Sequence, residues 1–331
     1  GGRATELMLS NNNFSLKTLC NLYLDHQESR ADVGEIKSLQ VHDQTLILRN
    51  FVKRVGTNRL VSDISTIDLQ NYRKKLIKAG KAPRTINNYI GAVKAMYNWA
   101  IDNKVIANFL NLKAIKKIPM KKIERSIFTP GQIKNLLEYA NSKMKAMILL
   151  ALNCGFGCTD CAELCWEHLD LQKGRVIFPR TKTGIRRNLP LWKNTIEALE
   201  NLPKISKYVF TTSQNNQYVR VVKKEYSGGT AKLVSYNMVS KMFSDLIKRA
   251  GLKVEKGVGF YTLRRTAATL AARSGDPFAV QRLLGHADLK MASVYVQDVS
   301  EQTDRVVNNV RNLIIQDESL SEANAVTDTG K

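Results

Sequence analysis

Three side chains that suit phosphate chemistry follow one another late in the sequence. Arg264 opens an alanine-rich segment, His286 follows Gly285, and Tyr295 comes nine residues after the histidine. A phenol is an oxygen nucleophile, while guanidinium and imidazole groups donate hydrogen bonds to oxygens on which negative charge accumulates. Arginine suits phosphate because its planar fork donates in pairs and keeps its charge. Together these residues predict attack by Tyr295 on a phosphate ester.

A lysine in a predicted hairpin adds an acid to this set. Lys182 lies in the run TKTG at 181–184, which joins two strand-like segments and has the composition of a turn. An ammonium group can protonate the oxygen that leaves phosphorus. Each residue also has a structural explanation: Tyr295 as a packing residue, His286 as a helix C-terminal group that interacts with the dipole, and Lys182 as a solvated charge. Their common order favours catalysis.

The segment TLRRT at 262–266, the Leu284-Gly285-His286 turn and Tyr295 together resemble the C-terminal signature of the tyrosine recombinase (phage integrase) family. The TKTG hairpin is similar to the lysine-bearing hairpin of that family. The resemblance implies that Tyr295 is the nucleophile of a 3′-phosphotyrosine intermediate. It also implies that Arg264 and His286 stabilise the phosphate and that Lys182 is the general acid. No cofactor is expected, because the phosphotyrosine link conserves the energy of the broken bond, and no metal is expected, because cations of the protein supply the electrostatics.

The same resemblance implies a function and a set of partners. The function is site-specific DNA recombination or integration, as in a mobile element. The partners are double-stranded DNA and further copies of the chain, from a dimer to a tetramer on DNA. The implied architecture is a C-shaped clamp around DNA, in which a helical N-terminal core-binding domain is joined to a mixed catalytic domain. The fold class predicted along the chain is mainly α with a small β-sheet (α+β).

Two positions depart from the pattern of the family. Asp160 stands three residues before the Glu163-Leu164 pair, where the family usually has its first arginine, and Tyr261 stands three residues before Arg264, where a histidine is usual. A carboxylate repels phosphate, and one lost charge-assisted donor in a transition state costs about 3 to 4 kcal/mol. A phenol donates a hydrogen bond but carries no positive charge. Two hypotheses stay open: an active recombinase, and a recombinase-derived DNA-binding protein with impaired cleavage.

Basic side chains elsewhere are candidates for contact with DNA. The chain has 51 Lys and Arg against 29 Asp and Glu, a formal net charge of +22, and such a surface attracts a polyanion, most commonly nucleic acid. The candidates lie on a polar helix face, in a basic segment and in the hairpin: Arg84, Asn87, Lys94, Lys116, Lys117, Lys121, Lys122, Arg180, Arg186 and Arg187. Ordinary solvation explains the helix face equally well. Any of the three hairpin arginines is also a candidate for the cation missing at position 160.

Four of the five cysteines support a different hypothesis, an iron–sulfur or zinc protein. Cys154, Cys158 and Cys161 have the spacing of radical S-adenosylmethionine enzymes, and Cys165 with His168 suggests a zinc site. The four cysteines also repeat at steps of four, three and four, which places them on one face of a helix. Cysteine is among the residues most often buried, and the surrounding segment has the pattern of a core helix. Buried cysteines without a metal are therefore favoured.

The length of 331 residues, with 44% apolar residues, predicts two globular domains. The expected parts are a flexible arm at 1–13, a helical DNA-binding domain at 14–109, a basic linker at 110–127, a catalytic domain at 128–315 and an acidic tail at 316–331. No apolar run approaches the roughly 20 residues of a membrane span, the first residues lack the apolar core of a signal peptide, and the odd cysteine count has no secreted spacing. These features predict a cytoplasmic, nucleoid-associated protein.

Local patterns predict the elements that position these residues. Helices are expected after the caps Ser15, Ser65 and Thr129, from Pro83 to about 100, and at 45–55, 144–152, 237–250, 263–272 and 277–284. Strands are expected at 175–178, 187–191 and 208–211. Residues 218–236 have the composition of a polar, glycine-containing excursion.

Overall fold

The architecture is known from a computed structural model, which describes residues 14–106, 110–120, 126–180, 182–226, 230–273 and 276–289, with the main chain alone at 226 and 230–232. The chain divides into two compact units. Within the described ranges, the first unit contains residues up to 120 together with 220–235, and the second contains 126–219 together with 236–289. Each unit has a hydrophobic core of its own.

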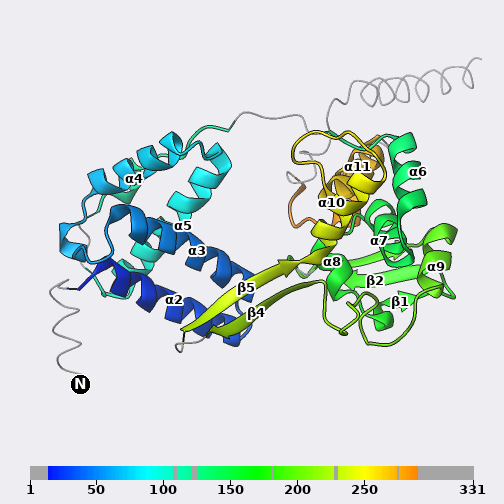
Figure 1. The fold of residues 1–331 in the computed structure, drawn as a ribbon, viewed down its shortest axis with the longest axis horizontal. Coiled ribbons are helices and arrows are strands. Elements are labelled where there is room, and N and C mark those ends of the chain that lie inside the picture. Colours follow the sequence, from blue (N-terminus) through cyan, green and yellow to red (C-terminus); the bar gives the residue numbers. More distant parts are fainter. Residues whose placement is uncertain are drawn as a thin grey trace, which may run out of the picture. The chain divides into compact units, whose positions relative to one another are not determined.

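In the first unit, the described residues up to 102 form a bundle of α-helices, drawn in blue to cyan in Figure 1. They are α2 (Leu16–Asp32), α3 (Ser38–Val55), α4 (Thr66–Lys78) and α5 (Pro83–Asp102), with the 3-10 turn η1 (Val61–Asp63) before α4. The predicted caps are present: the Ser15 hydroxyl accepts from the Thr18 N–H, and Ser65 and Asp68 form a capping box. Helix α3 begins seven residues before its predicted start. Three aromatic side chains pack edge to face in the core: Phe51, Tyr72 and Tyr97.

The segment that follows α5 is anchored to the first unit. The 3-10 turn η2 (Leu112–Ala114) leads to Ile115, which is buried in the core of this unit. The Asn87 amide donates to the Ile118 carbonyl at 2.9 Å and accepts from the Ile118 N–H at 2.8 Å, while Lys94 Nζ donates to the Ile115 carbonyl at 2.7 Å. The first half of the expected linker is therefore fixed by packing and hydrogen bonds.

The second unit is organised around α7 (Ser142–Asn153) and α11 (Phe260–Ala272), which pack against each other. Its other described helices are α6 (Pro130–Tyr139), α8 (Cys158–Glu163), α9 (Lys193–Glu200), α10 (Met238–Arg249), α12 (Pro277–Leu284) and the 3-10 turn η3 (Trp166–His168). Helix α7 contacts α9, and α11 contacts α10 and α12. Helix α11 begins three residues before its predicted start, so that Tyr261 lies within its first turn.

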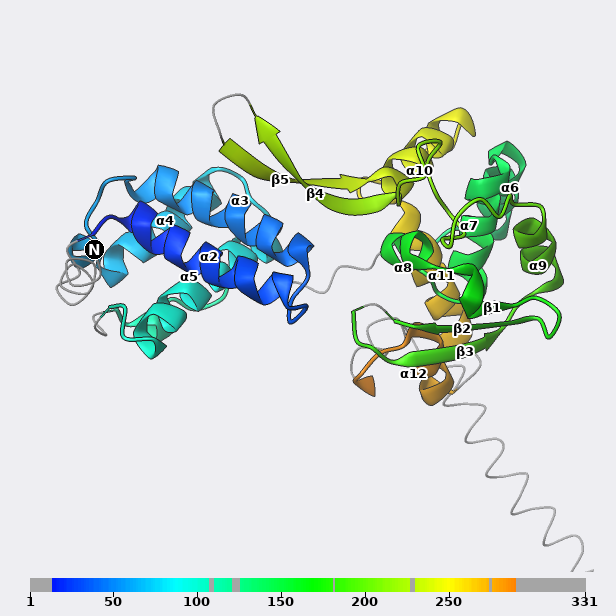
Figure 2. The ribbon, with the colours of Figure 1, turned by 90° about the horizontal axis from the view of Figure 1, so that it is seen from below.

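A small antiparallel sheet with the strand order β1-β2-β3 belongs to the second unit (Figure 2). Its strands are β1 (Leu169–Asp170), β2 (Arg175–Pro179) and β3 (Arg186–Pro190). In the register of β2 and β3, Phe178 pairs with Arg187. Side chains alternate along β3, so that Arg187 is buried while Arg186 and Asn188 are exposed. The predicted hairpin is confirmed, and the alternation of side chains along β3 directs Arg187 into the interior.

The prediction for residues 218–236 is wrong, because they form a long hairpin of two strands, β4 (Val219–Tyr226) and β5 (Thr230–Asn237). The side chains described on these strands are half-buried or exposed. Neither strand therefore has the buried face whose alternation marks a strand in a sequence. The expected strand at 208–211 is also wrong: single β-bridges join Tyr208 to Cys165 and Thr211 to Gln217, and the apolar residues between them, Val209 and Phe210, pack in the core.

The predicted fold class is confirmed, since the chain is mainly helical with small antiparallel sheets. Among the residues that the structure describes, no helix has both the length and the apolar character that a membrane crossing requires.

Candidate active site

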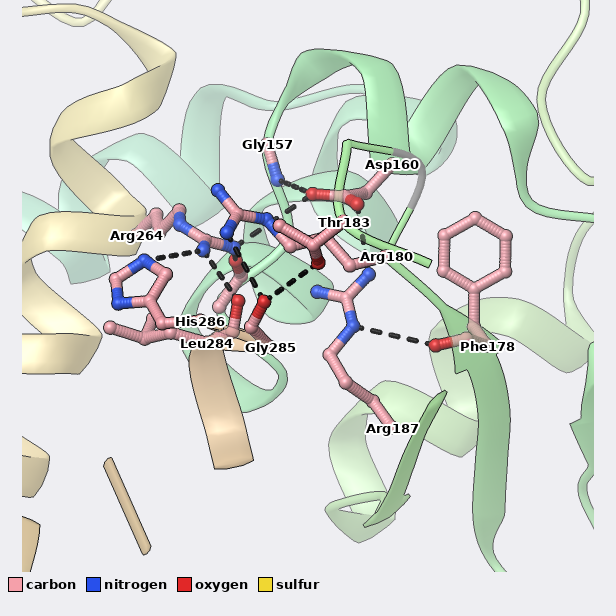
Figure 3. A network of polar contacts seen from close by, with 11 residues as sticks. Gly157, Asp160, Phe178, Arg180, Thr183, Arg187, Arg264, Leu284, Gly285 and His286 are labelled. Atoms are coloured by element: carbon pink, nitrogen blue, oxygen red, sulfur yellow. Dashed lines mark hydrogen bonds and ion pairs between the residues drawn. The ribbon is translucent and has the colours of Figure 1, made fainter. Parts of the chain in front are cut away.

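Five charged or titratable side chains from distant parts of the second unit meet in one network (Figure 3). They are Asp160 of α8, Arg180 directly after β2, Arg187 of β3, Arg264 of α11 and His286 directly after α12. All five are buried. Two of them, Arg264 and His286, are the predicted phosphate-binding pair, and the structure brings them together.

Arg264 is 1% exposed and joins two loops through main-chain carbonyl groups. Its Nη1 donates to the Gly155 carbonyl, in the loop between α7 and α8, and its Nη2 donates to the Leu284 carbonyl at 2.7 Å. The Leu284 carbonyl lies at the end of α12, where carbonyl groups have no partner within the helix. The Nε atom is buried, and no group in the described part of the chain accepts a hydrogen bond from it. The guanidinium is thus held in place while one donor stays unused.

His286 follows the left-handed residue that ends α12. Gly285 has φ 59°, and the His286 N–H donates to the Gln281 carbonyl at 3.0 Å, so that the helix closes in a tight turn. His286 Nε2 lies 3.4 Å from Arg264 Nη2. Burial lowers the pKa of His286 to about 4, and the charges of Arg264, Arg180 and Lys182 add to this lowering. The imidazole is therefore neutral at neutral pH.

The carboxylate of Asp160 is neutralised by a partner that the sequence does not reveal. Its Oδ1 accepts from Arg187 Nη2 at 2.8 Å, and its Oδ2 accepts from the Gly157 N–H at 2.8 Å, which caps the start of α8. Arg264 Nη1 lies 3.9 Å from Oδ2. The carboxylate of Asp160 is therefore paired inside a group of cations.

Arg187 is sealed in the interior, with 1% of its surface exposed. Its guanidinium lies 4.6 Å from the ring centroid of Phe156 and 5.5 Å from that of Phe178, and its Nε donates to the Phe178 carbonyl at 3.4 Å. Burial lowers the pKa of Arg187, and Asp160 opposes this lowering. The side chain still carries its charge, because arginine does not lose its proton in proteins. The sequence gives one indication of this burial: along a strand the side chains alternate, and residue 187 lies on the face of β3 that points inward.

Arg180 lies at the edge of the network, with 9% of its surface exposed. Its Nη1 donates to the Gly285 carbonyl at 3.2 Å, and the Thr183 hydroxyl donates to the same oxygen at 3.0 Å. The Arg180 N–H donates to the Ile185 carbonyl at 2.8 Å, which fixes the turn of the hairpin. Burial lowers the pKa of Arg180 and the charge of Arg264 adds to this, while Asp160 and the phenol of Tyr261 oppose it.

The remaining predicted site residues are exposed or lie outside the described residues, except Asn87 and Lys94, which are half-buried. Lys182 is exposed on the hairpin turn, close enough for its charge to affect His286. Tyr261 is 44% exposed on α11, one turn before Arg264. Three of the candidates lie outside the described residues: Tyr295, Lys121 and Lys122. Four of the candidate DNA contacts are exposed: Arg84, Lys116, Lys117 and Arg186.

The cysteines do not lie on one helix, which corrects that interpretation. Helix α7 ends at Asn153, Gly155 has φ 61°, and α8 begins at Cys158, so a left-handed residue interrupts the helical pattern. Their predicted burial holds for three of the four, Cys154, Cys161 and Cys165, while Cys158 is half-buried. Burial raises the pKa of the Cys154 thiol to about 12 and that of Cys158 to about 11.

One group of possible metal ligands occurs among the described residues: Cys165, Glu167 and His168, whose ligand atoms all lie within 4.8 Å of one another. His168 Nδ1 accepts from the Cys165 N–H at 3.0 Å, and its ring lies edge-on against Phe178, with 4.8 Å between the ring centroids. The imidazole thus already caps a turn and packs in the core.

Comparisons with known proteins identify relatives and structures that resemble the whole chain. The chain is 26% identical over 303 residues to a tyrosine recombinase XerC-like protein of Caldanaerobacter subterraneus subsp. tengcongensis, which covers 81% of this chain and 76% of that protein. A solved lambda integrase dimer bound to a COC′ core site has a TM-score of 0.67 at 19% identity and covers 91% of this chain and 82% of that chain. A lambda integrase tetramer bound to a Holliday junction has a TM-score of 0.65 at 19% identity, with 86% and 81% covered. At these identities, the likeness to the solved structures concerns the fold.

A family model described as the phage integrase family matches residues 126–302. The match covers more than half of the 331 residues and contains every member of the buried network. The resemblance read from the sequence is therefore confirmed, and the chain belongs to the phage integrase family of tyrosine recombinases.

Proposed function

We propose that the chain is a site-specific DNA recombinase or integrase that cleaves and rejoins DNA through a 3′-phosphotyrosine intermediate. The observation that supports the proposal most directly is the contact between Arg264 and His286 inside a cluster whose cations outnumber its anions. Three guanidinium groups and one carboxylate leave this buried region with an excess of positive charge, which suits a phosphate group and few other ligands.

In the proposed reaction, the phenolic oxygen of Tyr295 attacks phosphorus while the bond to the 5′ oxygen breaks. Arg264 and His286 donate to the non-bridging oxygens, and Lys182 gives a proton to the departing 5′ oxygen. The phenolic proton passes to water, since the lowered pKa that keeps His286 neutral also makes this imidazole a weak base. Attack of another 5′ hydroxyl on the phosphotyrosine link reverses the step and joins the strands. No nucleotide cofactor is required.

Partners of the chain follow from its charge and from its relatives. The net charge of +22 favours binding to DNA, and lambda integrase has been solved as a dimer on a core site and as a tetramer on a Holliday junction. We therefore infer that this chain binds double-stranded DNA and assembles on it as a dimer or tetramer. A location with the nucleoid belongs to the same proposal, as does the division into a DNA-binding domain and a catalytic domain.

Covalent trapping tests the proposal. A binding site is first selected from a library of random duplexes with the purified chain, and the selected duplex is then nicked beside each candidate phosphate. With such a suicide substrate, the released strand end diffuses away and the protein stays attached to DNA. We expect an adduct that survives denaturation, that maps to Tyr295 by mass spectrometry and that disappears in Tyr295→Phe. Tight binding to the selected site without any adduct would contradict the proposal.

A second candidate function predicts binding without an adduct, and the position of Asp160 gives a structural reason for it. The Asp160 carboxylate lies 3.9 Å from Arg264 and brings negative charge to a site that must attract phosphate. If the charge of Asp160 prevents productive binding of the scissile phosphate, the chain is a recombinase-derived DNA-binding protein with impaired cleavage. Tyr295→Phe would then bind the selected duplex as tightly as the wild type, and neither protein would form an adduct.

A further inference from the structure

The chain lacks the first arginine that the resemblance implies ahead of the Glu163-Leu164 pair, because no arginine occurs between Arg125 and Arg175. The hairpin of β2 and β3 brings two guanidinium groups, Arg180 and Arg187, to the buried network. The question is therefore which of the two reaches the phosphate.

Arg187 is engaged in holding Asp160. It is the more deeply buried of the two, lies against the rings of Phe156 and Phe178, and uses Nη2 for Asp160 and Nε for the Phe178 carbonyl. An ion pair at 2.8 Å in such surroundings largely cancels its own field at a distance. Arg187 thus removes the repulsion that Asp160 would exert on a phosphate, and it does so without reaching the surface.

Arg180 has the opposite character. It stands at the rim of the cluster, and the single hydrogen bond that its side chain makes to the described residues uses Nη1, so its Nε and Nη2 remain available. Its acceptor, the Gly285 carbonyl, is adjacent in the chain to His286, and Arg264 bonds the neighbouring Leu284 carbonyl. Arg180, Arg264 and His286 thus surround the same turn. A guanidinium in this place can donate to the phosphate oxygen that faces Arg264 and His286.

We propose that Arg180 is a catalytic residue that contacts the scissile phosphate in place of the first arginine, which this chain lacks, and that Arg187 is a positioning residue that neutralises Asp160. This inference rests on the proposed function. Its electrostatic support is that burial lowers the pKa of Arg180 and that the charge of Arg264 adds to this lowering. The negative charge of a bound phosphate would oppose both effects.

The test compares two substrates that differ in charge at one phosphate. On the selected duplex, Arg180→Ala is expected to form the covalent adduct about 100-fold to 1,000-fold more slowly than the wild type under single-turnover conditions with saturating protein. A methylphosphonate at the scissile position replaces a charged oxygen with a neutral methyl group, so it needs less neutralisation. On this substrate the defect of Arg180→Ala should shrink at least about tenfold, as expected when the lost charge-assisted donor no longer faces a charge. Arg180→Lys should fall between the wild type and the alanine variant on the phosphodiester.

Two outcomes would overturn the assignment of Arg180. One is an Arg180→Ala variant that forms adduct on the phosphodiester as fast as the wild type. The other is an equal loss on both substrates, which would indicate damage to the structure. Arg249→Ala is the matched control, because Arg249 is exposed in the last turn of α10 and its removal takes one positive charge from outside the cluster. A wild-type chain that binds DNA without forming adduct would instead refute the proposed function, so the two failures are distinguishable.

The role of Arg187 is tested by a double substitution. Arg187→Ala leaves a buried carboxylate without its partner, so this variant loses both stability and cleavage. Removing the carboxylate as well, in Asp160→Ala/Arg187→Ala, takes away the unpaired charge and is expected to restore at least about a tenth of the wild-type cleavage rate, the loss of one neutral pair being mild. If the double variant folds but cleaves no faster than Arg187→Ala, Arg187 contacts the phosphate itself and the positioning role is wrong.

Discussion

Arg187 Nη2 and Asp160 Oδ1 lie 2.8 Å apart in an ion pair that connects β3 to α8 in the interior of the second unit. The pair explains how an aspartate can lie in the region that we propose binds phosphate, since the charge of Arg187 offsets that of Asp160. A buried pair contributes little net stability while it is intact, but removal of one partner leaves an uncompensated charge.

Loss of Arg187 should therefore destabilise the fold. We expect Arg187→Met to lower the free energy of unfolding by about 3 to 5 kcal/mol, since it leaves the Asp160 carboxylate buried and unpaired. Asp160→Asn/Arg187→Met should recover part of this loss. Urea denaturation followed by circular dichroism measures both. Arg186→Met is the control, because Arg186 is exposed on the same strand and its loss should stay within about 0.5 kcal/mol. Equal losses in Arg187→Met and the double variant would show that the pair is not coupled.

Protonation of His286 should weaken the fold in mildly acidic solution. Burial lowers the pKa of this imidazole from 6.5 to about 4, so between these values the unfolded chain binds a proton that the folded chain does not. The stability that depends on a neutral His286 is present above pH 6.5 and is lost as the pH falls toward about 4. Carboxylates also titrate in this pH range, so the wild type is compared with a variant that lacks the imidazole. We expect the free energy of unfolding of the wild type minus that of His286→Gln to decrease with falling pH. Parallel pH curves would contradict the shift.

Gly155 should tolerate no side chain. Its φ is 61°, and an added Cβ would lie 2.9 Å from Leu284 Cδ2, while its carbonyl accepts from Arg264. The left-handed backbone costs a non-glycine residue about 1 to 2 kcal/mol, and the contact with Leu284 adds to this. Gly155→Ala should therefore reduce both stability and adduct formation. Gly91 has open space around its Cβ position within α5, so Gly91→Ala should raise stability by about 0.5 to 1 kcal/mol in the same urea titration. Unchanged adduct formation in Gly155→Ala would separate this loop from the site.

Cysteine reactivity tests the metal hypothesis. Burial raises the pKa of Cys154 to about 12 and holds that of Cys161 well above its usual value, so neither thiol should react with iodoacetamide in the native protein. Both should react in urea, as mass spectrometry would show. Elemental analysis of the purified chain should find no stoichiometric iron or zinc. Iron bound with a visible absorption band would favour the cluster hypothesis, and stoichiometric zinc would favour the group of Cys165, Glu167 and His168.

Local signals predicted the elements whose chemistry is contained within a few residues. The capping boxes at Ser65 and Thr129 place the starts of α4 and α6, and the turn composition of TKTG places the hairpin of β2 and β3. The hairpin of β4 and β5 gave no such signal because its strands lack a buried face. The order of Arg264 and His286 predicted their meeting, and the family pattern, rather than the physics of the segment, supplied their roles.

The partner of Asp160 could not be predicted from the sequence. The two residues of the pair are 27 positions apart, on a short helix and on a strand, and only the fold brings them together. Sequence reasoning offered three hairpin arginines as equal candidates. The alternation of β3 separates two of them, since it buries Arg187 and exposes Arg186. Arg180 differs again, because it follows the last residue of β2 and lies at the rim.

One oxygen atom, that of the Gly285 carbonyl, fastens the turn before His286 to the hairpin, because it accepts from both Arg180 and Thr183 across more than a hundred residues of sequence. The hairpin and the turn before His286 therefore depend on each other. A chimaera that takes only the hairpin from a relative would pair the Gly285 carbonyl with different donors. Chimaeric recombinases of this kind should therefore exchange both segments together.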